Sequence, residues 1–167
     1  DFPAPGIYRV DITGDFPRIF FNNTGDRQKI LTVEQWGSNP WTSMSGAFFG
    51  AANLRINALD APDLSAVIAL DNMFNGAVVM NDNINHWDVS NAQTIRRIFY
   101  GTLAFNQPLD NWNVGNVRDF RDTFYNSAFN QNIDNWDTGS GTNFAGMFMI
   151  NSVFNQPINN WNMASAT

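Results

Sequence analysis

The chain's 167 residues are enough for one domain with a substantial core, and 44% of them are hydrophobic, including fifteen Phe and six Trp. A net charge of −6 argues against nucleic acid and anionic membranes as partners, because phosphate groups require clustered Lys and Arg. No apolar run approaches the roughly 18 residues of a transmembrane helix, so direct membrane insertion is not expected. The absence of cysteine excludes disulfides and thiolate metal sites.

Asparagine supplies much of the polarity, since only 14% of the residues are charged. Asn tolerates the left-handed backbone region and bonds to its own backbone, so its abundance predicts many tight turns. The chain starts at Asp1 without a methionine or a signal peptide and stops in mid-pattern at Thr167. We therefore expect it to be part of a larger chain, with targeting and anchoring segments elsewhere.

Residues 1–35 alternate between apolar and polar in the manner of strands, with turn signals at Gly14-Asp15 and at residues 22–25. A stack of repeats exposes an apolar end and a sheet edge, which natural arrays cover with a cap. We predict that residues 1–35 form an N-terminal β-rich cap.

Residues 36–167 repeat with a period of 24 to 26 residues. The segment FNQPLDNWNVGNV from Phe105 returns as FNQNIDNWDTGSG from Phe129 and as FNQPINNW from Phe154. The position that usually holds tryptophan in each unit, here called the tryptophan position, is Trp36, Pro62, Trp87, Trp112, Trp136 and Trp161. Such a period is typical of stacked repeat proteins, in which each unit buries its apolar face against its neighbours.

Each unit reads L-x-x-W-x-V, with an aliphatic residue three places before the tryptophan position and an apolar one two places after it in most units. This matches the strand of a leucine-rich repeat with the Trp and Val side chains pointing inward. Short parallel strands are predicted at 33–38, 59–64, 84–89, 109–114 and 133–138, with a possible sixth at 158–163.

Apolar residues also recur five, eight and twelve places after the tryptophan position, as in Val117, Phe120 and Phe124, and this spacing predicts a short helix. Gly101 and its equivalents would end the helix in the left-handed conformation, which Asn126 tolerates and Ile150 does not. The predicted fold class is α/β: a leucine-rich-repeat-like solenoid of short parallel strands and short helices over residues 36–167, after the N-terminal cap.

The phrases MFNGA, FNQPLDNWNVGNV and FNQPINNW resemble BspA-like leucine-rich-repeat bacterial surface proteins, especially the 25-residue repeat family of mycoplasma-type surface lipoproteins. PGIYRVDITG and EQWG resemble the segment that leads into such arrays. The resemblance implies a secreted or cell-surface bacterial protein whose usual suggested role is adhesion, and it supplies no catalytic residues. Pro62 and Gly141 depart from the pattern, which puts the regularity of those two units in doubt.

A polar face is the candidate binding site, because the positions just before and just after each tryptophan position alternate with buried ones. Their short amide and carboxylate side chains suit a protein, peptide or glycan partner. The candidate residues are Asp63, His86, Asp88, Asn111, Asn113, Asn135, Asp137, Asn160 and Asn162. The alternative is a solvated face kept polar for solubility.

Metal chemistry has little support in the sequence. A column of hard oxygens at Asp60, Asp110 and Asp134 could hold calcium, but none of the segments matches a known calcium loop. We expect no cofactor. A second column at Asn81, Asn106, Asn130 and Asn155, followed by glutamines, is interpreted as structural, with stacked amides bonding the backbone of adjacent units.

Three classes of function remain. A binding or adhesion module is favoured, since stacked repeats offer an extended face and no catalytic constellation can be built around the single histidine, His86. A structural spacer in a larger surface protein is the alternative. A polysaccharide-active enzyme comes third, as it would need a pair of carboxylates flanking an aromatic cleft.

Overall fold

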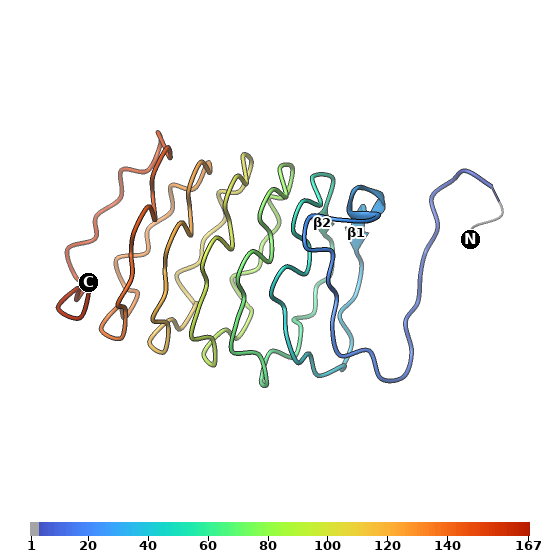
Figure 1. Ribbon diagram of the computed structural model, residues 1–167, viewed down its shortest axis with the longest axis horizontal. Coiled ribbons are helices and arrows are strands. Elements are labelled where there is room, and N and C mark those ends of the chain that lie inside the picture. The colour runs from blue at the N-terminus through green and yellow to red at the C-terminus, as the bar shows by residue number, and fades with distance from the viewer. Residues whose placement is uncertain (1–3) are drawn as a thin grey trace.

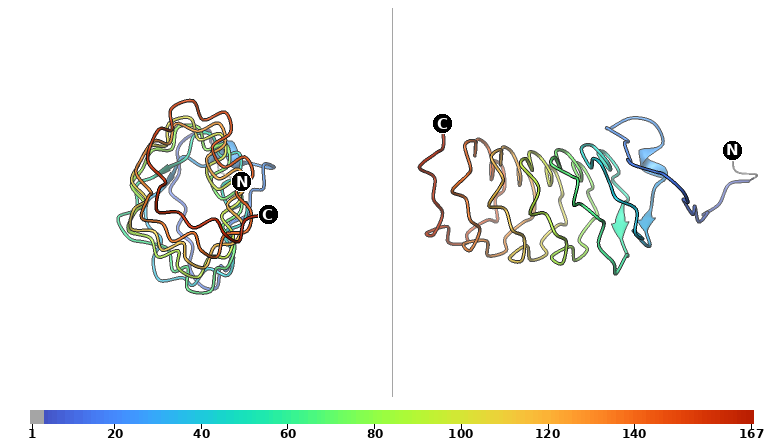
Figure 2. Two further views of the ribbon diagram at one scale, coloured as in Figure 1. Left: turned by 90° about the vertical axis from the view of Figure 1, so that its left-hand side faces the viewer. Right: turned by 90° about the horizontal axis from the view of Figure 1, so that it is seen from below.

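The structure is a computed structural model that describes residues 4–167 (Figure 1). From residue 36 on, the chain runs in successive circuits that lie side by side along one axis, and the end-on view superposes them around a common interior (Figure 2). Each circuit is called a rung here and begins at a tryptophan position. The five rungs are residues 36–61, 62–86, 87–111, 112–135 and 136–160, and residues 161–167 follow the fifth.

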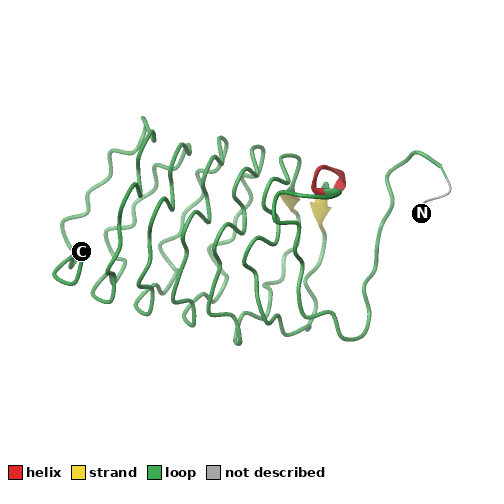
Figure 3. Ribbon diagram, viewed as in Figure 1, coloured by secondary structure: helices red, strands yellow, loops and turns green. Residues whose placement is uncertain are grey.

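Regular secondary structure is scarce in the described residues. It consists of the 3₁₀ helix η1 (Arg27–Lys29) and the strands β1 (Thr32–Val33) and β2 (Arg55–Ile56), which pair in parallel. Turns, bends and extended segments make up the rest (Figure 3). The predicted α/β leucine-rich-repeat-like solenoid of short strands and helices is therefore wrong.

The strands predicted from residue 84 on are absent because each of these L-x-x-W segments forms a tight turn. The backbone N–H of Trp112 donates to the carbonyl of Leu109 at 3.1 Å, and Trp87, Trp136 and Trp161 make the equivalent bond. Parallel bridges lie seven places after the tryptophan position instead. They join Ala69, Thr94, Asp119 and Asn143 on four consecutive rungs.

The predicted helices are replaced by consecutive β-turns whose backbone alternates its bonding partners. The N–H of Ile98 donates within its own rung to Ile95, whereas the N–H of Phe99 donates to Thr123 on the next rung at 3.1 Å. A helix would direct both groups along the chain. Two columns of residues with positive φ, ten and fourteen places after the tryptophan position, enforce the alternation. They are Gly46, Asn72, Arg97, Asp122 and Gly146 in one column, and Gly50, Gly76, Gly101, Asn126 and Ile150 in the other.

Stacked phenylalanines fill the interior along the axis. Phe74, Phe99 and Phe124 have no exposed surface, and their ring centroids follow one another at 6.0 and 5.6 Å with nearly parallel planes. A second column stacks Phe105 on Phe129 at 6.2 Å, and the two columns meet where Phe124 and Phe129 lie 4.0 Å apart. Burial of each ring stabilises the stack by about 1.5–3 kcal/mol.

Trp36, Trp87, Trp112 and Trp136 are buried as predicted, and Trp161 is partly buried. The indole Nε1–H groups of Trp112, Trp136 and Trp161 donate to the carbonyls of Ile84, Leu109 and Ile133, which lie three places before the preceding tryptophan position, at 2.9 to 3.1 Å. Trp87 has a buried Nε1 without a partner in the described structure. The equivalent acceptor would be the carbonyl of Leu59, three places before Pro62, and Leu59 is 95% exposed. The irregularity expected at Pro62 is therefore confirmed.

The N-terminal segment covers the first rung without forming a β-rich cap, so this part of the predicted fold class is also wrong. Of the predicted cap, residues 4–35 contain η1 and only the two-residue strand β1. Phe16 packs edge-on against Trp41, and the N–H groups of Phe21 and Asn23 donate to the carbonyls of Ala47 and Phe49. Residues 1–3 of the predicted cap lie outside the described residues.

Candidate functional site

All nine predicted binding residues are exposed, and they form two rows along the stack. His86, Asn111, Asn135 and Asn160 precede successive tryptophans, while Asp63, Asp88, Asn113, Asp137 and Asn162 follow the tryptophan position. We call them the front row and the back row. Because each row takes one residue from each rung, it repeats at the spacing of the rungs.

A local turn fixes each side chain of the back row. Oδ1 of Asp88 accepts a hydrogen bond from the backbone N–H of Ser90 at 3.0 Å, and Asn113 does the same with Gly115 at 3.1 Å. Asp63, Asp137 and Asn162 make the equivalent bond. Hydrogen bonds from Ser90 lower the pKa of Asp88, and those from Ser65 lower the pKa of Asp63. Asp63 and Asp88 therefore favour the ionised form more than free aspartate does.

The front row is held by bonds between rungs. Nδ2 of Asn135 donates to the carbonyl of Asp110 at 2.7 Å, and Nδ2 of Asn160 donates to the carboxylate of Asp134 at 2.7 Å. Nε2 of His86 lies 3.5 Å from the carbonyl oxygen of Asp60. These amides present oriented donors and acceptors on a fixed backbone.

Two successive tryptophan positions bring four of the predicted residues around one hollow. His86 and Asp88 contribute from either side of Trp87, and Asn111 and Asn113 contribute from either side of Trp112. Asn85 completes the lining with Trp87. Neither Asn85 nor Trp87 was among the predicted site residues. The remaining five predicted residues lie outside this hollow, along the same two rows.

The calcium candidates serve as hydrogen-bond acceptors on separate rungs. Asp60 accepts the backbone N–H groups of Trp36 and Gly37, at 2.8 to 3.2 Å. Partial burial raises the pKa of Asp60. The hydrogen bonds from these N–H groups lower it, and the net shift of the pKa is downward. Asp110 accepts from Asn85, and Asp134 accepts from Asn160. Over residues 4–167, no group of three or more His, Cys, Asp or Glu side chains is placed to hold a metal ion.

The asparagine column is structural, as the sequence predicted. Oδ1 of Asn81 accepts the backbone N–H of Asn106 at 2.9 Å and Nε2 of Gln107 at 3.2 Å. Asn106 repeats both bonds toward Asn130 and Gln131 on the next rung, and Asn130 repeats them toward the rung after that. Each asparagine thereby joins two rungs.

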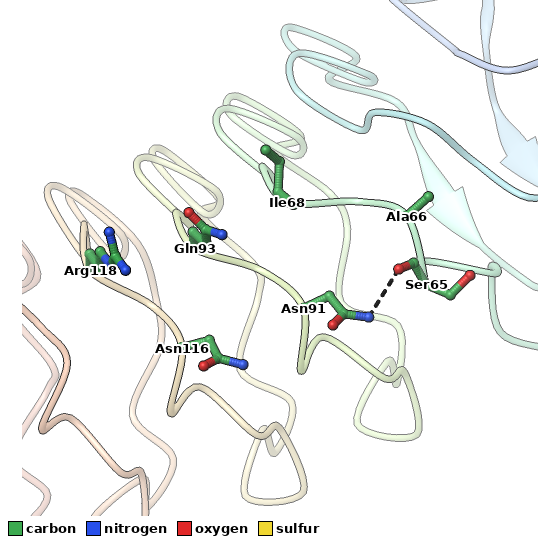
Figure 4. A pocket seen from close by; sticks show the side chains of 7 residues that line it. All are labelled: Ser65, Ala66, Ile68, Asn91, Gln93, Asn116 and Arg118. Atoms are coloured by element: carbon green, nitrogen blue, oxygen red, sulfur yellow. Dashed lines mark hydrogen bonds between the residues drawn. The ribbon is translucent and has the colours of Figure 1, made fainter.

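A second groove, which the sequence analysis missed, lies further along each rung (Figure 4). It crosses three rungs and is lined by residues three, four and six places after the tryptophan position: Ser65, Ala66, Ile68, Asn91, Gln93, Asn116 and Arg118. The sequence did contain a signal for this groove. Asn91 and Asn116 stand at equivalent positions of successive units, and Gln93 and Arg118 follow each of them two residues later. The prediction of a short helix in this segment rested on its apolar residues and gave those polar side chains no role.

Comparison with known families identifies the class of protein. The family model described as "Mycoplasma protein of unknown function, DUF285" matches residues 15–128 and 117–167. The chain belongs to this family, which agrees with the resemblance to mycoplasma-type surface proteins found in the sequence. No curated protein and no solved structure matches the chain. Within the described residues, no helix has the length and apolar character needed to cross a membrane.

Proposed function

We propose that this chain is a binding module of a secreted or cell-surface bacterial protein, related to the BspA-like surface proteins. Its front and back rows would recognise an extracellular protein, peptide or glycan. The observation that carries the proposal is the hollow lined by His86, Asp88, Asn111 and Asn113. Hydrogen bonds to the backbone hold the side chains of Asp88 and Asn113 in fixed orientations there. Preorganised polar groups lose little entropy when a partner binds.

The chemistry of the two rows suits a hydrogen-bonding partner. Asp63 and Asp88 are held in the ionised form, and the amides of the front row add donors and acceptors beside them. Peptide backbones and sugar hydroxyls offer the complementary groups. The same polarity disfavours an apolar ligand, because burying these carboxylates without partners would be costly.

The test is a binding screen followed by a substitution that spares the fold. The chain is screened against extracellular matrix proteins, peptides and glycans, and the double variant D88N/D137N is then compared with wild type on each retained partner. Asparagine keeps the local turn, as Asn113 and Asn162 show, but removes the charge. We expect about tenfold weaker binding, since a charge-assisted hydrogen bond contributes roughly 1.5–3 kcal/mol.

The matched control is D11N/D15N, which removes the same charge from the exposed N-terminal segment. Binding that is unchanged in D88N/D137N, or weakened equally in the control, would contradict the assignment to these rows.

A structural spacer is the second candidate function. It is supported by the unbroken column of stacked rings that runs from Phe48 through Phe74, Phe99 and Phe124 to Phe148. Such a column resists bending along its length. A chain that retains no partner in the screen favours the spacer, and neither candidate requires catalysis.

A further inference from the structure

Arg118 differs from most basic side chains of this acidic chain in having no partner for its charge. Of the nine Lys and Arg residues, six form ion pairs, namely Arg9, Lys29, Arg55, Arg96, Arg97 and Arg121. Arg18 lies over the ring of Phe20 and donates to a carbonyl. Arg27 forms no ion pair either, but it is half-buried and its Nε is enclosed. Across residues 4–167, the exposed guanidinium of Arg118 forms neither an ion pair nor a side-chain hydrogen bond.

Arg118 lies in the second groove, at one end of a column that crosses three rungs. Its backbone N–H donates to the carbonyl of Gln93 at 2.8 Å, and the N–H of Gln93 donates to the carbonyl of Ile68 at 2.9 Å. The three residues are thus direct neighbours along the axis. Ile68, at the other end, exposes 58% of its surface. The column therefore runs from an apolar end to a cationic end.

Two asparagines beside this column offer oriented acceptors. Nδ2 of Asn91 donates to the carbonyl of Ser65 at 3.0 Å, and Nδ2 of Asn116 donates to the carbonyl of Ser90 at 2.8 Å. Their amides are thereby fixed, and each keeps its Oδ1 for another donor (Figure 4). Gln93 adds an exposed amide between Ile68 and Arg118.

We infer that this groove binds an extended acidic segment of a partner protein. The guanidinium of Arg118 takes a carboxylate, which it can bind with two parallel hydrogen bonds. The amides of Asn91, Asn116 and Gln93 bond the peptide backbone, and Ile68 contacts an apolar side chain. Polypeptide is favoured over acidic glycan by that apolar end, because a sugar offers little to an exposed isoleucine.

The spacing sets the pattern of the bound segment. Two rung steps of about 4.8 Å separate the rungs of Ile68 and Arg118. A segment in the extended polyproline II conformation advances about 3.1 Å per residue and has three residues per turn, so side chains three places apart share one side. An apolar residue and an acidic residue three places apart therefore match the two ends of the groove. This site is separate from the front and back rows, so the two assignments can fail independently.

The experiment is selection from a random heptapeptide library on wild type, R118Q, I68S and the control R9Q, which makes the same change in charge on an exposed arginine. Wild type and R9Q are expected to enrich acidic residues spaced three places from an apolar one. R118Q should lose the acidic preference, with at least tenfold weaker binding of the peptides selected on wild type. I68S should lose the apolar preference and keep the acidic one.

Three results would overturn the inference. The first is that wild type retains no peptide. The second is that wild type and R118Q enrich acidic residues equally. The third is that peptides are not retained but acidic oligosaccharides such as oligogalacturonate bind in a way that depends on Arg118. Binding of a selected peptide at rising salt provides a further check. A contact to a carboxylate weakens with ionic strength, whereas binding that is insensitive to salt contradicts the role of Arg118.

Discussion

Trp112 has two structural roles at once. Its ring is 3% exposed inside the stack, and its indole N–H donates to the carbonyl of Ile84, three places before Trp87, at 3.1 Å. Trp112→Ala leaves a large cavity and an unsatisfied carbonyl, so we expect a loss of about 3–5 kcal/mol in the free energy of unfolding. Chemical denaturation measures this loss.

The control for Trp112→Ala is Asp110→Ala, two residues away and exposed. Asp110 accepts one side-chain bond from Asn85, so its replacement should cost no more than about 1 kcal/mol. Equal destabilisation by the two substitutions would contradict the inward position of the tryptophan.

Two aspartates of the back row, Asp63 and Asp88, make stability depend on pH. Hydrogen bonds from Ser65 and Ser90 hold the pKa values of Asp63 and Asp88 below the ordinary value of 3.8. A lowered pKa in the folded state gives stability that is present above the ordinary pKa and is lost as the pH falls through the folded value. The melting temperature of wild type should therefore fall below about pH 4.

The double variant D63N/D88N tests this origin of the pH dependence. Asparagine makes the same local turn at Asn113 and Asn162 and does not titrate. The fall in melting temperature between pH 4 and pH 2 should therefore be smaller in the variant. Identical profiles for the two proteins would show that these carboxylates are not responsible.

The paired β-turns of each rung depend on residues that tolerate positive φ. Four of the five positions in the second column are glycine or asparagine, and the fifth is Ile150 at φ +59°. A β-branched residue is strained in this region by roughly 1–2 kcal/mol. Ile150 is 62% exposed, so little burial is lost on its removal. We expect Ile150→Gly to raise the melting temperature, while Gly101→Ile, at the equivalent position, should lower it.

Burial was predictable from the sequence, but the backbone was not. Phe120 and Phe124 are buried as predicted, because side chains four places apart face the same way on two consecutive β-turns as well as on a helix. Apolar spacing alone does not distinguish these structures. The sequence did contain a signal against a helix. In most rungs the residues ten and fourteen places after the tryptophan position are Gly, Asn or Asp, and Asn72 and Asp122 are examples that adopt positive φ.

Ile150 shows why a residue-by-residue rule was insufficient. The sequence analysis expected the last full unit to end differently there, because isoleucine disfavours positive φ. In the structure Ile150 adopts the same conformation as Gly101 and Asn126. The carbonyl of Met149, the residue just before Ile150, accepts a hydrogen bond from the N–H of Asn126 on the neighbouring rung. This bond fixes the backbone next to Ile150. Contacts between rungs therefore override a local preference.

Of the candidate site, the sequence predicted the exposed rows but not the second groove. Alternation around Trp87 and Trp112 was enough to place His86, Asp88, Asn111 and Asn113 on the surface. The groove at Arg118 depends on how Ile68, Gln93 and Arg118 align across three rungs, which the helical interpretation obscured.

At the scale of the whole molecule, the stack is held together by the same contacts on every rung. Backbone bonds link rungs on one side, the asparagine column links them on another, and phenylalanine columns fill the interior. Since these contacts join adjacent rungs, stability should be close to a sum of local terms and the polar rows should keep their geometry along the axis. Both proposed binding surfaces depend on this arrangement.

The most direct test of the arrangement is NMR measurement of scalar couplings across backbone hydrogen bonds. The structure predicts a coupling between the amide nitrogen of Phe99 and the carbonyl carbon of Thr123, and another between Phe124 and Met147. Couplings from Phe99 to Ile95 and from Phe124 to Phe120 would instead indicate helices. Detection of the inter-rung pair supports stacked β-turns, and detection of the intra-rung pair would contradict the account.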